Sequence, residues 1–267
     1  MNRVRLLVCF SLVMVFGRHP VLGDFSDNFD TYAAGAAPGG TWVDFGGSQP
    51  LVISTTQAHS GANSLRLSEG TDTLGNSSTG YGSDVFTNLG LTTPLTSGQH
   101  TLSYWQFIEP GVDSVAFGFF TSGLLPATFE TGVDLRAATF DAFGVGTGML
   151  VVQDIGNPPS ATLVAAPVPL VTGAWAEIKY EIDLGTNLYN FSYNGTQMVT
   201  GLQWDTNPAN GASLGGINLW MQLGNTNGTN SFVYYDDFQL VSVPEPAGST
   251  PWIVALSGAV LFRRRAT

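Results

Sequence analysis

The segment from Trp175 to Thr200 reads WAEIKYEIDLGTNLYNFSYNGTQMVT. Apolar and polar side chains alternate strictly over its first part. One face carries Ala176, Ile178, Tyr180, Ile182 and Leu184. The other face carries Trp175, Glu177, Lys179, Glu181 and Asp183. A period of two with one apolar face predicts a half-buried strand of an antiparallel sheet.

Two further strands follow in the same stretch. A turn at Gly185–Asn187 leads into a strand over Leu188–Tyr193, and Asn194-Gly195 then leads into Thr196–Thr200. Asn-Gly between two apolar runs favours a two-residue type I′ turn, because both turn residues need positive φ. The stretch therefore predicts a meander of three strands.

The rest of the chain has the same character. Gly, Asn and Pro turns separate short apolar runs, and no part of the body shows a sustained 3.6-residue apolar period. We expect an all-β fold, a two-sheet antiparallel β-sandwich or jelly roll, with very little helix. The further strands are expected at Leu51–Thr55, Ser64–Ser68, Thr101–Ile108, Val115–Phe120, Gly132–Phe140, Gly148–Gln153, Ile217–Leu223 and Phe232–Val241.

The beginning of the chain has the pattern of a secretory signal peptide. Arg3 and Arg5 precede an apolar segment from Leu6 to Phe16, and a small residue stands before an expected cut at Asp24. Residues 1–23 are therefore predicted to be a signal helix, and residues 24–242 the β-sandwich domain. Cys9, the only cysteine, lies inside the signal, so the exported body is expected to fold without disulfides.

The charge of the body narrows the choice of partners. Between residues 24 and 246 only Arg66, Arg136 and Lys179 are basic, against all 20 acidic residues, which leaves a net charge of −17. Such a surface repels phosphate backbones, so the sequence argues against a nucleic-acid partner.

The last residues have the order of a sorting signal. Val243-Pro244-Glu245-Pro246 ends any strand, an apolar segment follows at about residues 250–262, and Arg263, Arg264 and Arg265 come next. Residues 243–267 closely resemble the PEP-CTERM signal, which implies processing by an exosortase. The resemblance implies a short C-terminal membrane helix that holds an inner-membrane precursor transiently, before release to the cell surface or extracellular matrix. A plain C-terminal anchor or a buried terminal helix is the alternative.

A second resemblance concerns the body. The segments Asp27–Asp30, Ala58–Leu67 and Tyr234–Leu240 look like the opening and closing strands of jelly-roll carbohydrate-binding domains. Residues 175–199 are similar to the laminin-G and concanavalin A-like pattern, in which a tryptophan-led strand precedes a strand that ends in Asn-Gly. The resemblance implies a concanavalin A-like sandwich in which the first and last strands pair.

Pairing of the terminal strands would bring several oxygen-bearing side chains together. Carboxylate and amide oxygens are the ligands that calcium takes in proteins, so a structural calcium site is one hypothesis. The alternative is that Asp236 caps a loop through backbone N–H groups while Asp237 is solvated. The candidate metal ligands are Asp27, Asn28, Asp30, Asp236 and Asp237.

Tryptophans are the candidate sugar platforms, since carbohydrate rings stack on flat aromatic faces flanked by polar groups. Trp204 is the first choice, because it is expected in a turn-rich loop with Asp205 and Asn207. Trp175 and Trp220 fall on the polar side of their strands. Trp42 and Trp105 are further possibilities, and core packing is the alternative for each of these tryptophans.

Catalysis finds little support in the chain. Glycoside hydrolases that resemble laminarinases carry Glu-x-Asp-x-x-Glu on one strand. Glu181-Ile182-Asp183 matches its first half, but Thr186 stands where the second glutamate should be. Without that glutamate the proton donor for the leaving group is missing. We therefore expect no enzyme.

Three functions follow from these observations. The first is a non-catalytic exported surface or matrix protein that binds exopolysaccharide or a cell-surface glycan. The second is a polysaccharide-degrading hydrolase or lyase of the concanavalin A-like fold. The third is a structural matrix protein without a specific ligand.

Overall fold

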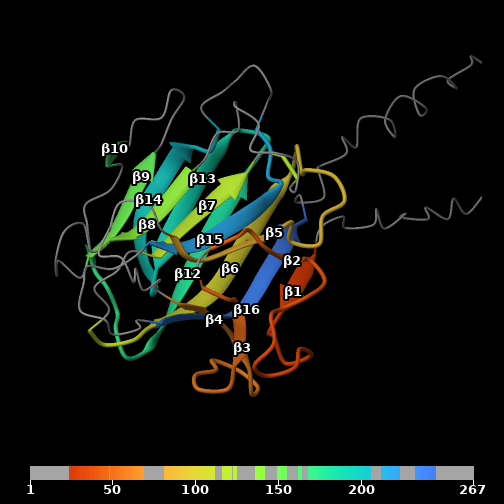
Figure 1. Cartoon of the computed structure of the whole chain (residues 1–267). Coiled ribbons are helices and arrows are strands. Elements are labelled where there is room, and N and C mark those ends of the chain that lie inside the picture. The colour runs from red at the N-terminus through yellow and green to blue at the C-terminus, as the bar shows by residue number, and fades with distance from the viewer. Residues whose placement is uncertain are drawn as a thin grey trace, which may run out of the picture.

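Two antiparallel β-sheets lie face to face in the computed structural model of the chain (Figure 1). The structure describes residues 24–47, 49–68, 81–111, 116–121, 123–124, 136–141, 149–154, 162–163, 168–205, 212–222 and 232–244. The described residues contain strands, turns and bends but no helix. The predicted all-β sandwich is therefore confirmed, whereas the predicted signal helix and C-terminal membrane helix lie outside the described residues. No helix among the described residues is long and apolar enough to span a membrane.

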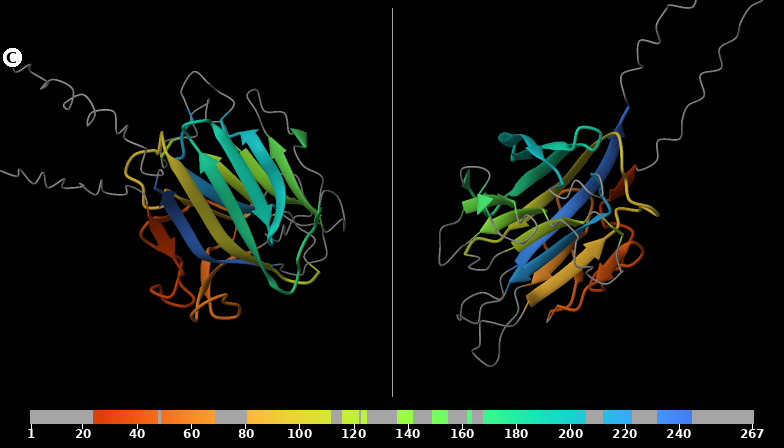
Figure 2. Two further views of the ribbon diagram at one scale, coloured as in Figure 1. Left: turned by 180° about the vertical axis from the view of Figure 1, so that it is seen from behind. Right: turned by 90° about the horizontal axis from the view of Figure 1, so that it is seen from above.

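The first sheet, sheet A, is built around the meander predicted from residues 175–200. Its strand order is β14-β13-β12-β6-β16-β4-β3, and β1 also pairs with β16. The left view of Figure 2 looks onto the outer face of this sheet. The bounds are β1 Phe25–Asp27, β3 Val52–Ser54, β4 Ser64–Ser68, β6 Gln99–Ile108, β12 Trp175–Asp183, β13 Leu188–Tyr193, β14 Thr196–Gln203 and β16 Phe232–Val243.

The second sheet, sheet B, has the order β10-β9-β8-β7-β15-β5-β2, with β11 paired to β9. The prediction from sequence missed several of its strands, because β2, β5, β10 and β11 are short or lack a clean alternation. The bounds are β2 Trp42–Asp44, β5 Tyr81–Thr87, β7 Ala116–Thr121, β8 Arg136–Asp141, β9 Met149–Asp154, β10 Thr162–Leu163, β11 Val168–Pro169 and β15 Gly216–Gln222.

The turn between β13 and β14 has the predicted geometry. Asn194 and Gly195 both have positive φ, 46° and 75°, as a type I′ turn requires. The turn closes the β13–β14 pair at Tyr193 and Thr196. The predicted two-residue turn is therefore confirmed, although the register of the β13–β14 pair shifts on either side of Phe191.

The core lies between the two sheets and follows the predicted alternation. Every apolar residue on the predicted inner face of residues 175–184 is buried. Side chains from β5, β7 and β15 of sheet B pack against these residues in the core. The central buried side chains include Leu102, Tyr104, Ile178, Tyr180, Phe191 and Phe238 of sheet A and Val85, Phe120, Ile217 and Leu219 of sheet B.

The first and last described strands lie side by side, as the jelly-roll resemblance implied. β1 pairs antiparallel with β16, with Phe25 opposite Leu240 and Asp27 opposite Phe238. The same side of β16 is occupied farther along by β4, with Phe232 opposite Ser68. This arrangement brings the segment after β1 and the loop after β3 together with Asp236 and Asp237 in the middle of β16. β1, β3 and β16 lie at one side of the molecule in Figure 1.

Candidate functional site

A row of aromatic side chains crosses the outer face of sheet A. Trp175 of β12 lies opposite Phe107 of β6, and Phe107 lies opposite Tyr234 of β16. The ring centroids of Phe107 are 5.6 Å from Trp175 and 6.0 Å from Tyr234. Phe107 and Tyr234 are buried, whereas Trp175 is half-buried. The three neighbouring strands are seen together in the left view of Figure 2.

Trp105 and His59 extend this row toward solvent. Trp105 points to the same face of β6 as Phe107 and is half-buried. The imidazole of His59 stacks on its indole, with centroids 3.9 Å apart and planes inclined by 14°. His59 also meets Trp175 edge to face at 5.7 Å. We call these five residues, His59, Trp105, Phe107, Trp175 and Tyr234, the aromatic surface.

Two adjacent aspartates of β16 hold His59 in place. The Oδ2 atom of buried Asp236 accepts hydrogen bonds from the backbone N–H groups of His59 and Ser60, at 2.8 and 3.2 Å. Asp237 binds the side chains of the same two residues. Its Oδ2 lies 2.6 Å from His59 Nδ1, and its Oδ1 accepts a 2.5 Å bond from the Ser60 hydroxyl.

Asp30 fastens the other end of the same loop. Its Oδ1 accepts hydrogen bonds from the backbone N–H groups of Ala62 and Asn63, at 2.7 and 3.0 Å. Gly61, with φ of +62°, lies so close that a Cβ atom there would be 1.7 Å from Asp30 Oδ2. The loop over His59–Asn63 is thus clamped by Asp30 on one side and by Asp236 and Asp237 on the other.

A β-bulge explains how Asp236 and Asp237 can both reach the loop. The register of β16 against β6 shifts between Asp236 and Gln239, and Asp237 adopts a positive φ of 49°. The bulge reverses the alternation, so Asp236 leaves the side of Phe238 and lies under the loop. Burial raises the pKa of Asp236 to about 6, although the N–H groups of Ser60, His59 and Asp237 act in the opposite direction.

The predicted metal ligands are therefore engaged with the protein itself. Asp27 accepts hydrogen bonds from the N–H of Phe29, the hydroxyl of Tyr32 and the indole N–H of Trp42. The amide of Asn28 donates to Asp30. Among the described residues no group of three or more acidic, histidine or cysteine side chains is arranged to hold a metal ion. Asp236 caps a loop, as the alternative held, but Asp237 is bonded to His59 and Ser60. Structural calcium is a hypothesis that a chelation experiment tests.

Trp204, the first choice for a sugar platform, lies in the core instead. Its side chain is 2% exposed, and its indole N–H donates to the carbonyl of Ser213. The ring packs on Phe120 and Tyr189. The prediction of a surface platform here is corrected, because the side chain turns inward and packs in the core between the two sheets. Asp205 is buried too, and Asn207 lies outside the described residues.

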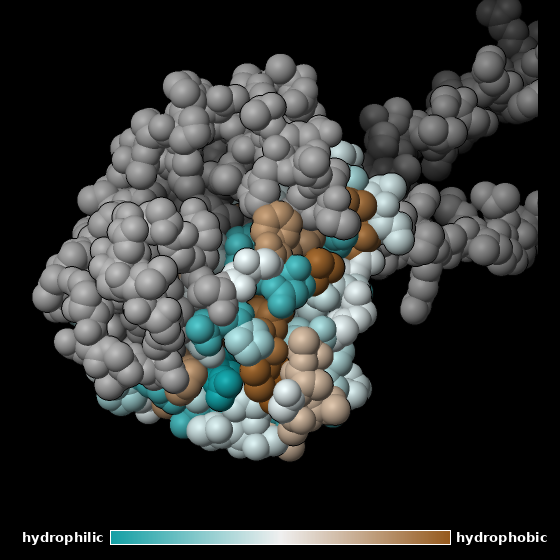
Figure 3. All heavy atoms as spheres, viewed as in Figure 1, coloured by the Kyte–Doolittle hydropathy of each residue, from teal (hydrophilic) through white to brown (hydrophobic). Residues whose placement is uncertain are grey.

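The other tryptophans are divided between core and surface. Trp42 is buried and bonded to Asp27, so it belongs to the core. Trp220 of β15 is half-buried on sheet B, opposite Asp84. Figure 3 faces this side of the molecule and shows polar and apolar side chains closely mixed over the described residues. Trp175 is the predicted tryptophan that joins the aromatic surface, together with Trp105.

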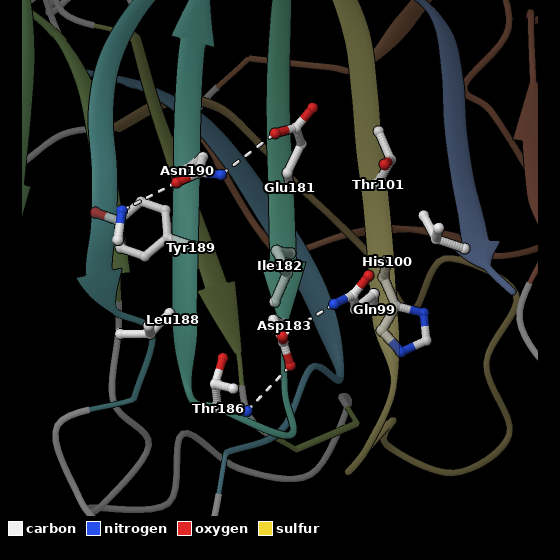
Figure 4. Close-up of a pocket in the computed structure, with 12 residues that line it drawn as sticks. Gln99, His100, Thr101, Glu181, Ile182, Asp183, Thr186, Leu188, Tyr189 and Asn190 are labelled. Carbon is white, nitrogen blue, oxygen red and sulfur yellow. Dashed lines mark hydrogen bonds between the residues drawn. The ribbon is translucent and has the colours of Figure 1, made fainter. Parts of the chain in front are cut away.

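A separate depression of about 420 Å³ lies on the outer face of sheet A, at the end where β16 stops (Figure 4). Its lining includes Glu181 and Asp183, the two residues that match the first half of the hydrolase motif. Glu181 accepts a 2.7 Å bond from Lys179 and a 3.3 Å bond from Asn190. Asp183 accepts bonds from the N–H of Thr186 and the amide of Gln99.

These two carboxyl groups are poor candidates for a catalytic acid. The hydrogen bond from Lys179 holds the pKa of Glu181 below its ordinary value, and the N–H of Thr186 does the same for Asp183. A general acid in glycoside hydrolysis needs a raised pKa so that it keeps its proton. The geometry of this depression therefore gives the hydrolase hypothesis no support.

Comparison with known proteins places the fold. No family model matches the chain, and no curated protein matches it. Among solved structures, cellulose induced protein Cip1 superposes with a TM-score of 0.54 at 19% identity, covering 82% of this chain and 97% of that one. A prokaryotic β-1,3-1,4-glucanase (lichenase) from a mouse hindgut metagenome reaches 0.51 at 17% identity, covering 83% and 100%.

A third solved structure is the carbohydrate recognition domain of Emp47p. Its TM-score is 0.52 at 13% identity, and the superposition covers 83% of this chain and 95% of that domain. Together these likenesses show a jelly-roll sandwich of the concanavalin A-like type, as the sequence predicted. At such identities they show the fold alone, so the function must be argued from the residues of this chain.

Proposed function

We propose that this chain is a non-catalytic, exported surface or matrix protein whose β-sandwich binds polysaccharide at the aromatic surface. The observation that carries the proposal is the contact of half-buried Trp105 and Trp175 with one exposed imidazole, His59. Aromatic rings that keep part of their area in solvent offer apolar faces to the C–H groups of a sugar ring. Polar groups beside them can bind the hydroxyls.

The rigidity of this surface supports a binding role. Trp105 and Trp175 project from adjacent central strands, and His59 sits on a loop held by three aspartates. A site whose side chains are already fixed loses less conformational entropy when a ligand binds. The positive φ of Asp237 is a strained conformation of the kind that tends to occur at functional sites.

The likeness to carbohydrate-related proteins agrees with this proposal at the level of fold. The lichenase is a glucanase, and the Emp47p structure is a carbohydrate recognition domain. Both an enzyme and a binding domain thus share the sandwich. The lowered pKa values of Glu181 and Asp183 make these two groups poor general acids, so the proposed role is binding.

Export and sorting complete the proposal. β16 ends at Val243 and Pro244 follows at once, so the sorting motif would begin directly where sheet A stops. We expect an exosortase to process the chain at Val243–Pro246 and to release it from a transient hold in the inner membrane. Mass spectrometry of the exported protein should find Arg263–Arg265 removed. A mature protein that retains these arginines would contradict the sorting proposal and leave the binding proposal standing.

One experiment separates the three functional hypotheses. The purified protein is incubated with exopolysaccharide of the producing cells and with plant and algal glycans, while release of reducing sugar is measured in the same tubes. Binding without release is the expected result. Release of sugar would support a hydrolase or lyase, and neither binding nor release would support a structural matrix protein without a ligand.

A further inference from the structure

We infer that the polysaccharide bound at the aromatic surface is neutral and rich in hydroxyl groups, and is not a polymer of uronic acids or sulfated sugars. This inference rests on the proposed function. It comes from the charges and hydrogen-bonding groups that border the aromatic surface in the described residues.

Carboxylates border the aromatic surface on several sides. Glu177 of β12 lies directly opposite Trp105 and points to the same outer face. Glu109, just after β6, accepts a 2.9 Å bond from the Tyr234 hydroxyl. Asp237 holds His59. An anionic sugar placed on the tryptophans would meet these like charges at short range.

The basic side chains of this face do little to offset that charge. The ammonium of Lys179 lies 2.7 Å from Glu181, so its charge is already compensated. Arg66 of β4 lies opposite Tyr234 at the edge of the aromatic surface, with its guanidinium 4.6 Å from the centroid of the Phe232 ring. Arg66 is thus the cation that an acidic ligand would have to use, and the carboxylates of Glu177, Glu109 and Asp237 outnumber it.

The hydrogen-bonding groups point to the same class of ligand. Because a carboxylate only accepts, the bond to Asp237 places a hydrogen on His59 Nδ1. In the neutral ring the other nitrogen, Nε2, is then an acceptor, and no partner occupies it among the described residues. Glu177 and Glu109 are acceptors too. A border made of acceptors needs a ligand that donates, and sugar hydroxyls donate where a carboxylate or a sulfate does not.

The test compares a neutral and an acidic polymer on the same protein. Binding of the purified protein to a soluble mixed-linkage β-glucan and to polygalacturonate is measured at 20 mM and 300 mM NaCl. We expect at least tenfold tighter binding of the glucan at low salt, with less than a twofold change on raising the salt. Glu177→Lys should strengthen binding of polygalacturonate at least fivefold. Asp44→Asn, a charge change on sheet B, should leave the binding of both polymers unchanged.

The possible failures are distinguishable. Tighter binding of polygalacturonate that disappears at high salt or in Arg66→Met would overturn the inference about ligand class and leave sugar binding in place. Absence of binding to either polymer and to the native exopolysaccharide would overturn the proposed function, and this inference with it.

Discussion

The imidazole of His59 stacks on the indole of Trp105 at 3.9 Å while its Nδ1 lies 2.6 Å from the carboxylate of Asp237. One side chain thus joins a surface loop to two neighbouring strands of sheet A. The indole and the imidazole are nearly parallel, so each limits the rotation of the other. The loop therefore contributes a ring to the aromatic surface and does not merely cover it.

Loss of the His59 ring should weaken glycan binding. We expect His59→Ala to lower affinity three- to tenfold, because Trp105 loses the partner that fixes its orientation. His59→Phe keeps the stacking but loses the bond to Asp237 and the acceptor Nε2, so it should fall between His59→Ala and the wild type. Titration followed by tryptophan fluorescence measures both variants. Equal affinities for all three proteins would contradict a positioning role for His59.

The clamp on the His59–Asn63 loop predicts an unusual cost at one glycine. Gly61→Ala should lower the free energy of unfolding by about 3 kcal/mol. Positive φ accounts for about 1–2 kcal/mol, and displacement of Asp30 from two N–H groups accounts for the rest. Gly35→Ala is the matched control, because its φ is +78° and nothing lies within 4 Å of the added Cβ. Urea unfolding should give a loss at Gly35 of about 1–2 kcal/mol, and equal losses at both sites would refute the clamp.

The buried carboxyl of Asp236 should make stability depend on pH. Its pKa of about 6 lies above that of an unfolded aspartate, so folding favours the protonated form. Its contribution is present below about pH 4 and is lost as pH rises through 6. Relative to Asp236→Asn, the wild type should lose up to about 3 kcal/mol of unfolding free energy between pH 4 and pH 7.5. Urea unfolding at both pH values measures this, and a constant difference would contradict it.

Calcium offers a further test of the aspartate clamp. Each carboxylate oxygen of Asp236 and Asp237 accepts a hydrogen bond from the protein, so the loop can be held without an ion. We expect EDTA to leave the melting temperature of the purified protein unchanged. A fall of several degrees that added calcium reverses would instead establish the structural calcium site proposed from the sequence.

The sequence predicted the sandwich because its signals are local. Strict alternation over residues 175–184 and the Asn194-Gly195 turn each depend on residues close in the chain. The same local pattern does not predict the position of Asp236. Alternation along β16 places it beside Phe238, but the bulge between Asp236 and Gln239 moves it to the other face. Nothing in the local pattern marks that extra residue.

The candidate site was predicted only in part for a similar reason. Trp175 was identified from the alternation of its strand, whereas Trp105 became prominent only once His59 was seen to stack on it. Trp204 was misplaced, because its burial depends on rings of two other strands, Phe120 of β7 and Tyr189 of β13. Packing between the sheets cannot be read from the polar residues that flank a tryptophan.

The most direct test of the central claim compares three tryptophans in one titration against a soluble neutral β-glucan. Trp175→Ala and Trp105→Ala alter the aromatic surface, and Trp220→Ala, a half-buried tryptophan of sheet B, is the matched control. Far-UV circular dichroism and the melting temperature verify that each variant is folded. The account predicts that affinity falls at least tenfold, about 1.4 kcal/mol, for each change on sheet A and less than twofold for Trp220→Ala. Unchanged affinity in folded Trp175→Ala and Trp105→Ala, or an equal loss in Trp220→Ala, would contradict it.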